Sequence, residues 1–158
     1  MSSAPIRVVF DCNVFAQALI SPGGPAGACV EAARSGQLQL LLSECVLREL
    51  VELPSKLPER MKVTAERIDT LIVQLQICGE YFDPVPSNYV NPFDPDDSPY
   101  VDLAVHGSAA IIASRDKHML RLMDLSVPAG REFHERFPGV MVLTPEKLLG
   151  KLQSVKSF

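Results

Sequence analysis

Short apolar runs recur along this chain and predict buried strands. The first run covers residues 6–11, and shorter candidates fall at residues 38–42, 81–85, 110–113 and 140–143. The first run is β-branched and continuously apolar, as expected for a strand that is covered on both faces. The pattern therefore favours a sheet that lies between two layers of other elements.

Helices are expected between these strands. They run from about residue 13 to the turn at 21–25, over 25–35, after Ser43, and over 64–79, 98–107, 116–123 and the segment after Thr144. Ser43 and Thr64 are expected N-caps, because their hydroxyls can accept hydrogen bonds from free first-turn amides. Residues 124–139 are expected to be irregular. Alternating strands and helices predict an α/β fold with a parallel sheet, and residues 1–158 are expected to form one domain.

Composition and charge narrow the function classes. The chain has 158 residues, of which 47% are hydrophobic and 22% are charged, as in an ordinary globular domain. It has no apolar run of the ~18 residues that a transmembrane helix needs, and we expect neither membrane association nor a secretory signal. The four cysteines lack metal-binding spacing and predict reduced thiols in a cytoplasmic protein. A formal net charge of −4 requires that any polyanion bind through a local patch or through metal.

Four acidic residues lie where apolar elements begin or end: Asp11, Glu49, Asp97 and Asp116. Ligands of open α/β sheets bind outside the carboxyl ends of the strands, so we expect these side chains at one edge. Four carboxylates there would repel one another unless a divalent cation neutralised them. Hard carboxylate oxygens suit Mg²⁺ or Mn²⁺, and the lack of a Cys/His ligand set argues against zinc.

Each acid also has a plain structural alternative. Asp11, Asn13 and the acids at 94–97 can cap helices, and Glu49 can pack its methylenes while its carboxylate reaches water. An EF-hand loop at 94–105 is excluded, because Pro99 and Val105 stand where Gly and Glu are required. Taken together, the four positions favour a metal site over four independent caps.

Five segments in this order and spacing resemble the PIN-domain family, and more narrowly its branch of toxins from toxin–antitoxin modules. They are residues 8–14, 21–25, 42–50, 94–97 and 113–117, and the likeness spans about residues 6–150. The resemblance implies a three-layer α/β/α Rossmann-like fold with a central parallel sheet of about five strands. It also implies RNA cleavage with Mg²⁺ or Mn²⁺, and relatives commonly form homodimers or higher homo-oligomers.

Carried over to this chain, the resemblance assigns catalysis and metal binding to the four acids. The expected supporting residues are Asn13, Asp96, Ser114 and His118. His118 departs from the family, whose members often have an acid there. By analogy with such nucleases, the products should carry 5′-phosphate and 3′-hydroxyl ends.

Substrate contacts are expected near the fourth acid. Arg115, Lys117 and Arg121 are candidates to hold the phosphate backbone, with a second basic cluster over residues 56–67, although a solvated helix face is the favoured explanation for most of these cations. Cys12 has no evident His partner, so no protein nucleophile is expected.

The leading hypothesis is a metal-dependent endoribonuclease, the toxin of a toxin–antitoxin pair, with RNA and a cognate antitoxin as partners. The alternative is a catalytically silent module that binds RNA or protein, suggested by His118 and the negative net charge. A nucleotide-binding Rossmann domain is disfavoured, because no Gly-x-Gly-x-x-Gly follows the first strand.

Overall fold

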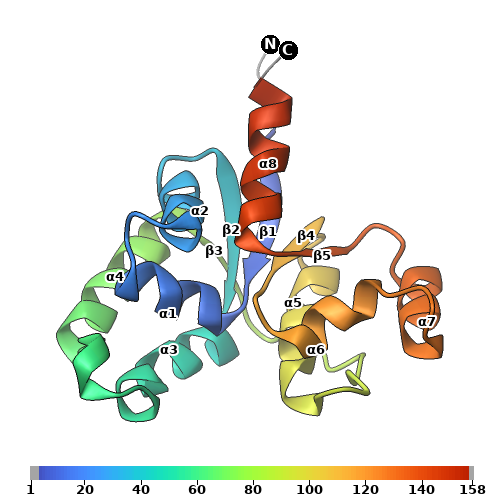
Figure 1. Ribbon diagram of the computed structural model, residues 1–158, viewed down its shortest axis with the longest axis horizontal. Coiled ribbons are helices and arrows are strands. Elements are labelled where there is room, and N and C mark those ends of the chain that lie inside the picture. The colour runs from blue at the N-terminus through green and yellow to red at the C-terminus, as the bar shows by residue number, and fades with distance from the viewer. Residues whose placement is uncertain (1–3, 157–158) are drawn as a thin grey trace.

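A five-stranded parallel sheet forms the centre of the computed structural model, which describes residues 4–156 (Figure 1). Its order is β3-β2-β1-β4-β5, with β1 at Ile6–Phe10, β2 at Leu38–Ser43, β3 at Glu80–Phe82, β4 at Ile111–Ala113 and β5 at Met141–Leu143. The predicted α/β fold and the predicted parallel sheet of about five strands are confirmed.

Helices cover the sheet in two layers. In Figure 1, α1 (Cys12–Ile20), α2 (Pro25–Arg34), α3 (Glu44–Lys56) and α4 (Ala65–Cys78) lie to the left of the strands. The helices α5 (Ser98–His106), α6 (Lys117–Leu120) and α7 (Pro128–Arg136) lie to the right, and α8 (Pro145–Lys156) contacts α2 and β5. Most of β1 and all but one residue of β2 are buried, as the continuous apolar patterns require.

Both predicted N-caps are present. The Ser43 hydroxyl accepts a hydrogen bond from the amide of Val46, and the Thr64 hydroxyl accepts one from the amide of Arg67. The Ser43 cap fixes where β2 ends and α3 begins, and therefore sets the rotation of α3 about its axis. That rotation buries Val46 and Leu50 against the sheet.

The strand order reverses beside β1. The chain passes from β1 to β2 and β3 on one side, then crosses to β4 and β5 on the other. The segments that leave β1 and β4 therefore diverge, and open α/β sheets place their ligands in the crevice at this point. Asp11 follows β1, and Ser114 and Asp116 follow β4.

Three local predictions require correction. Residues 124–139 are not irregular, because α7 occupies Pro128–Arg136 with its proline in the first turn. A single helix over 116–123 is wrong, since α6 ends at Leu120 and a 3₁₀ turn, η3 (Arg121–Met123), follows. The third strand is shorter than 81–85. The helix α7 has few apolar residues, and buried Phe133 holds it by packing edge-on against Tyr89 and Phe137.

Candidate metal centre

The pairing of β1 with β4 places Asp11 next to Ser114. Phe10 is in register with Ala113, and the Asp11 amide donates to the Ala113 carbonyl at 2.9 Å. The buried Ser114 hydroxyl then donates to Asp11 Oδ2 at 2.7 Å, and Asn13 Nδ2 approaches the same oxygen at 3.4 Å. The side chain of Asp11 makes no capping hydrogen bond to α1. The Asn13 amide in the first turn of α1 still lowers the pKa of this carboxylate, but a helix cap does not account for its shorter hydrogen bond from Ser114.

The turn after β4 holds Asp116 in place. Its backbone N–H donates a hydrogen bond to the Ser114 hydroxyl at 3.0 Å, and Asn13 Oδ1 accepts one from the backbone N–H of Arg115 at 3.2 Å. Asp116 Oδ1 accepts the His118 amide at 2.8 Å and so caps α6. One oxygen of Asp116 therefore serves as a helix cap, as the structural alternative predicts. Asn13 and Ser114 both hydrogen-bond to these segments, and their role as supporting residues stays a prediction.

Asp97 reaches the same place from the other side. It ends the 3₁₀ turn η2 (Pro95–Asp97) and precedes α5, yet its side chain makes no capping hydrogen bond. The carboxylate is buried, and its Oδ2 atom has no hydrogen-bond partner within residues 4–156. Burying a carboxylate oxygen without a hydrogen-bond partner costs free energy, and a bound cation would offset that cost.

Asn91 ties the segment before Asp97 to the turn after Asp116. Asn91 is fully buried. Its side-chain Nδ2 donates a hydrogen bond to the His118 carbonyl at 3.3 Å, and its backbone N–H donates one to the Ser98 hydroxyl at 2.8 Å. These bonds connect the two chain segments that carry aspartates. No local sequence pattern distinguished Asn91 from any other loop asparagine.

The three aspartates converge. One carboxylate oxygen from each of Asp11, Asp97 and Asp116 lies within 4.8 Å of the other two. Burial is the main reason that the pKa of Asp11 is raised to about 6 and the pKa of Asp97 to about 8, and the neighbouring carboxylates raise both further. Ionising Asp11 and Asp97 together near neutral pH is therefore unfavourable without a counter-charge. An all-oxygen donor set with one unpartnered buried atom fits Mg²⁺ or Mn²⁺.

Glu49 lies beside this group rather than in it. It projects from α3, half-buried, and its carboxylate accepts a hydrogen bond from the Tyr100 hydroxyl. Its charge helps to raise the pKa of Asp11, which places it near the three aspartates. The assignment of Glu49 as a metal ligand therefore stays a prediction, and Tyr100 is a neighbour that the sequence did not single out.

The remaining predicted site residues lie at the rim. Asp96 is exposed, and the hydrogen bonds recorded for His118 are made by its main chain. Arg115 pairs with Glu146 at 2.7 Å, and Arg121 lies over the ring of Phe93 at 4.5 Å from its centroid, whereas Lys117 is exposed.

The second basic cluster is partly occupied with structural contacts. Lys56 pairs with Glu52, and the Arg67 guanidinium donates to the carbonyls of Lys62 and Leu19. These contacts favour a structural role for Arg67. Lys117 is therefore the more available cation for a phosphate backbone.

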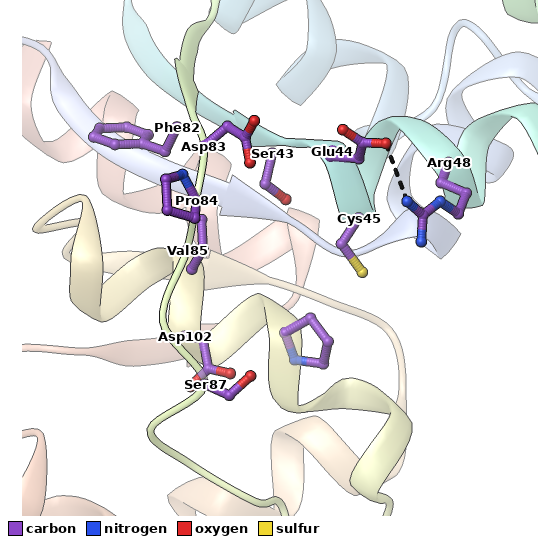
Figure 2. Close-up of a pocket in the computed structure, with 11 residues that line it drawn as sticks. Ser43, Glu44, Cys45, Arg48, Phe82, Asp83, Pro84, Val85, Ser87 and Asp102 are labelled. Atoms are coloured by element: carbon purple, nitrogen blue, oxygen red, sulfur yellow. Dashed lines mark hydrogen bonds and ion pairs between the residues drawn. The ribbon is translucent and has the colours of Figure 1, made fainter.

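A cavity of about 320 Å³ lies between α3, the segment after β3, and α5, and its lining does not include Asp11, Asp97 or Asp116. Figure 2 shows its lining, including Ser43, Cys45 and Asp83, and the ion pair between Glu44 and Arg48. The Cys45 thiol lies 4.0 Å from a carboxylate oxygen of Glu49, so the cavity adjoins the site. Its exposed carboxylates make it a poor receptor for a phosphate group.

The cysteines and the helices bear on two further expectations. All four cysteines are free, and burial raises the pKa of the Cys12 thiol to about 12, which argues against a thiolate nucleophile. Among the described residues, no helix is long and apolar enough to cross a bilayer.

Comparison with known proteins agrees with this geometry. A family model described as PIN domain matches residues 7–118, which include all four acids. The uncharacterized protein MJ1680 of Methanocaldococcus jannaschii is 28% identical over 149 residues, which cover 87% of this chain and 95% of that protein.

Proposed function

This chain belongs to the PIN-domain family, a family of nucleases in general, and on that premise we propose that it is a metal-dependent endoribonuclease. The observation that carries the proposal is the convergence of Asp11, Asp97 and Asp116 at the reversal point of the sheet. Their burial and mutual repulsion leave a site that is stable near neutral pH only with a cation or with bound protons.

The residues around the aspartates have distinct tasks. Asp11, Asp97 and Asp116 would hold the ion, and the Ser114 hydroxyl fixes the orientation of Asp11 through its hydrogen bond. Glu49, at the edge of the group, would complete the negative face toward solvent. When bound, Mg²⁺ or Mn²⁺ supplies Lewis-acid stabilisation of the phosphodiester and makes water a better nucleophile.

The substrate and setting are part of the same proposal. RNA is proposed over DNA, with hydrolysis leaving 5′-phosphate and 3′-hydroxyl ends, and Lys117 is the leading candidate for a phosphate contact. A role as the toxin of a toxin–antitoxin pair, with a cognate antitoxin and a homo-oligomeric state, extends the proposal. The four free thiols support a cytoplasmic setting.

The direct test is cleavage of end-labelled RNA by the purified protein. We expect cleavage with Mn²⁺, none with EDTA, and none by an Asp11→Asn variant that folds normally. Asp69→Asn is a matched control, because Asp69 is an exposed aspartate on α4 and is not among the predicted site residues. Activity that survives both EDTA and Asp11→Asn would refute the proposal.

A silent binding module remains the second candidate, and one observation favours it. Glu49, one of the four expected acids, is not among the three acids that converge. Calorimetric titration with Mn²⁺ separates the candidates. Heat of binding at submillimolar Mn²⁺ favours the nuclease, whereas no binding at millimolar Mn²⁺ favours the silent module.

A further inference from the structure

The Tyr100 hydroxyl joins three elements beside the metal centre. Tyr100 lies in the first turn of α5, three residues after Asp97, and its side chain is only 2% exposed. The hydroxyl accepts the backbone N–H of Cys12 at 3.1 Å and donates to Glu49 Oε2. It therefore connects the beginning of α1, the middle of α3 and the beginning of α5.

The direction of these hydrogen bonds follows from the groups involved. The Cys12 amide belongs to the first turn of α1 and has no acceptor within its own helix, and the Asp11 side chain does not cap it. An amide N–H only donates, so the Tyr100 oxygen must accept from it. The single hydroxyl proton is then left for Glu49, whose carboxylate only accepts. If the hydroxyl were removed, Cys12 would lose a buried hydrogen bond and Glu49 a partly buried one.

The position of this hydroxyl decides where the Glu49 carboxylate lies. Glu49 is a long side chain on α3, and its other side-chain hydrogen bond within the described residues is the weak one from the Cys45 thiol at 4.0 Å. Cys12 directly follows Asp11, and Asp97 lies one helical turn before Tyr100. Tyr100 thus fixes the position of the Glu49 carboxylate relative to the two segments that carry Asp11 and Asp97.

We propose that Tyr100 is a positioning residue that holds the Glu49 carboxylate at the edge of the three-aspartate site. The inference rests on the proposed metal-dependent nuclease function. Tyr100 touches neither the ion nor the RNA in this role and acts through Glu49. Without the hydroxyl, the Glu49 side chain would sample several rotamers, and its contribution to metal binding and catalysis would fall.

Tyr100→Phe isolates the hydroxyl, because the buried ring stays in place. A merely structural role would also be sensitive to this change, so the readout must depend on Glu49. We therefore combine Tyr100→Phe with Glu49→Ala in a double-mutant cycle, in which coupling appears as non-additivity. Tyr89→Phe is the matched control, since Tyr89 is 9% exposed and its hydroxyl makes no hydrogen bond within the described part of the chain.

Two quantities are measured on all variants: Mn²⁺ affinity by calorimetry and kcat for cleavage of a labelled RNA. Tyr100→Phe should lower at least one of them by about 10-fold, as the loss of a partner that orients a metal-site carboxylate typically does. Glu49→Ala should cost at least as much, and adding Tyr100→Phe to it should change nothing further. Tyr89→Phe should match the wild type in both measurements.

Other outcomes separate the two proposals. The positioning role alone is overturned if Tyr100→Phe has the Mn²⁺ affinity and kcat of the wild type. It is also overturned if Tyr100→Phe has the same effect in the Glu49→Ala background as in the wild-type background. If the wild type binds Mn²⁺ but cleaves no RNA, the nuclease proposal fails, and the Mn²⁺ cycle still decides the role of Tyr100. A wild type that binds no Mn²⁺ refutes both.

A second variant tests the same idea without altering the core. Glu49→Asp keeps the charge but shortens the side chain by one methylene, so the carboxylate no longer reaches the Tyr100 hydroxyl. Its Mn²⁺ affinity and kcat should fall to the values of the Glu49→Ala variant. Wild-type Mn²⁺ affinity and kcat in Glu49→Asp would overturn the proposal even if Tyr100→Phe did not fold.

Discussion

Replacing Asp11 by Asn should stabilise the metal-free protein while abolishing its response to metal. The change keeps the shape of the side chain and leaves an oxygen that can accept the hydrogen bond from Ser114. It removes the negative charge, which is buried beside two other carboxylates. In the absence of a cation this charge is a cost to folding, and in its presence it is a ligand.

The magnitude follows from the pKa of Asp11, which burial raises from 3.8 to about 6. The folded protein therefore keeps this proton to a higher pH than the unfolded chain does, and stability falls as the pH rises from about 4 to about 6. One pKa unit corresponds to about 1.4 kcal/mol, so the loss above pH 6 is about 3 kcal/mol. The charge of Asp11 also raises the pKa of Asp97, and its removal relieves that repulsion as well.

Urea denaturation of EDTA-treated wild type and Asp11→Asn measures this difference. At pH 7.5 the variant should be more stable by up to about 3 kcal/mol, and the advantage should shrink toward zero as the pH falls to about 4. Mn²⁺ at 100 times its dissociation constant should stabilise the wild type by about 2.7 kcal/mol. The variant should gain little.

Two results would refute this reasoning. If Asp11→Asn is less stable than the wild type in EDTA at pH 7.5, the charged Asp11 carboxylate stabilises the metal-free fold instead of destabilising it. If Mn²⁺ stabilises both proteins equally, Asp11 is not needed to bind the ion. Asp69→Asn, a change to an exposed acid on α4, should leave both measurements unchanged.

Four further substitutions give three separate tests. Ser114→Ala removes a hydrogen bond that lowers the pKa of Asp11, so RNA cleavage should fall by about 10-fold, and the rising limb of its pH–rate profile should move to higher pH. Gly130→Ala should lower the free energy of unfolding by about 1–3 kcal/mol, because its Cβ would lie 1.9 Å from a backbone oxygen; Gly150→Ala, with nothing within 4 Å, should instead raise it by about 0.5–1 kcal/mol in the same urea titration. Lys117→Ala, in the uncleaving Asp11→Asn background, should weaken RNA binding about equally across sequences and reduce the salt slope by about 1, as measured by fluorescence anisotropy.

The sequence by itself determined the α/β alternation, the strands and most helix boundaries. These features depend on interactions within a few residues, such as the apolar run of β1 and the hydroxyl caps of Ser43 and Thr64. The helix α7 was missed because one buried contact, Phe133 in an aromatic cluster with Tyr89, holds it in place of an apolar stripe. Tertiary packing outweighs a weak local pattern there.

For the candidate site, the sequence indicated which carboxylates to consider, and the tertiary structure decided how they meet. Asp11 and Ser114 are 103 residues apart and touch only because β1 pairs with β4 in one register. Tyr100 reaches Glu49 across 51 residues, and that contact holds the Glu49 carboxylate beside the three aspartates. Residue types and their local spacing are written along the chain, whereas contacts between distant segments depend on register and helix rotation, which exist only once the sheet and its layers have assembled.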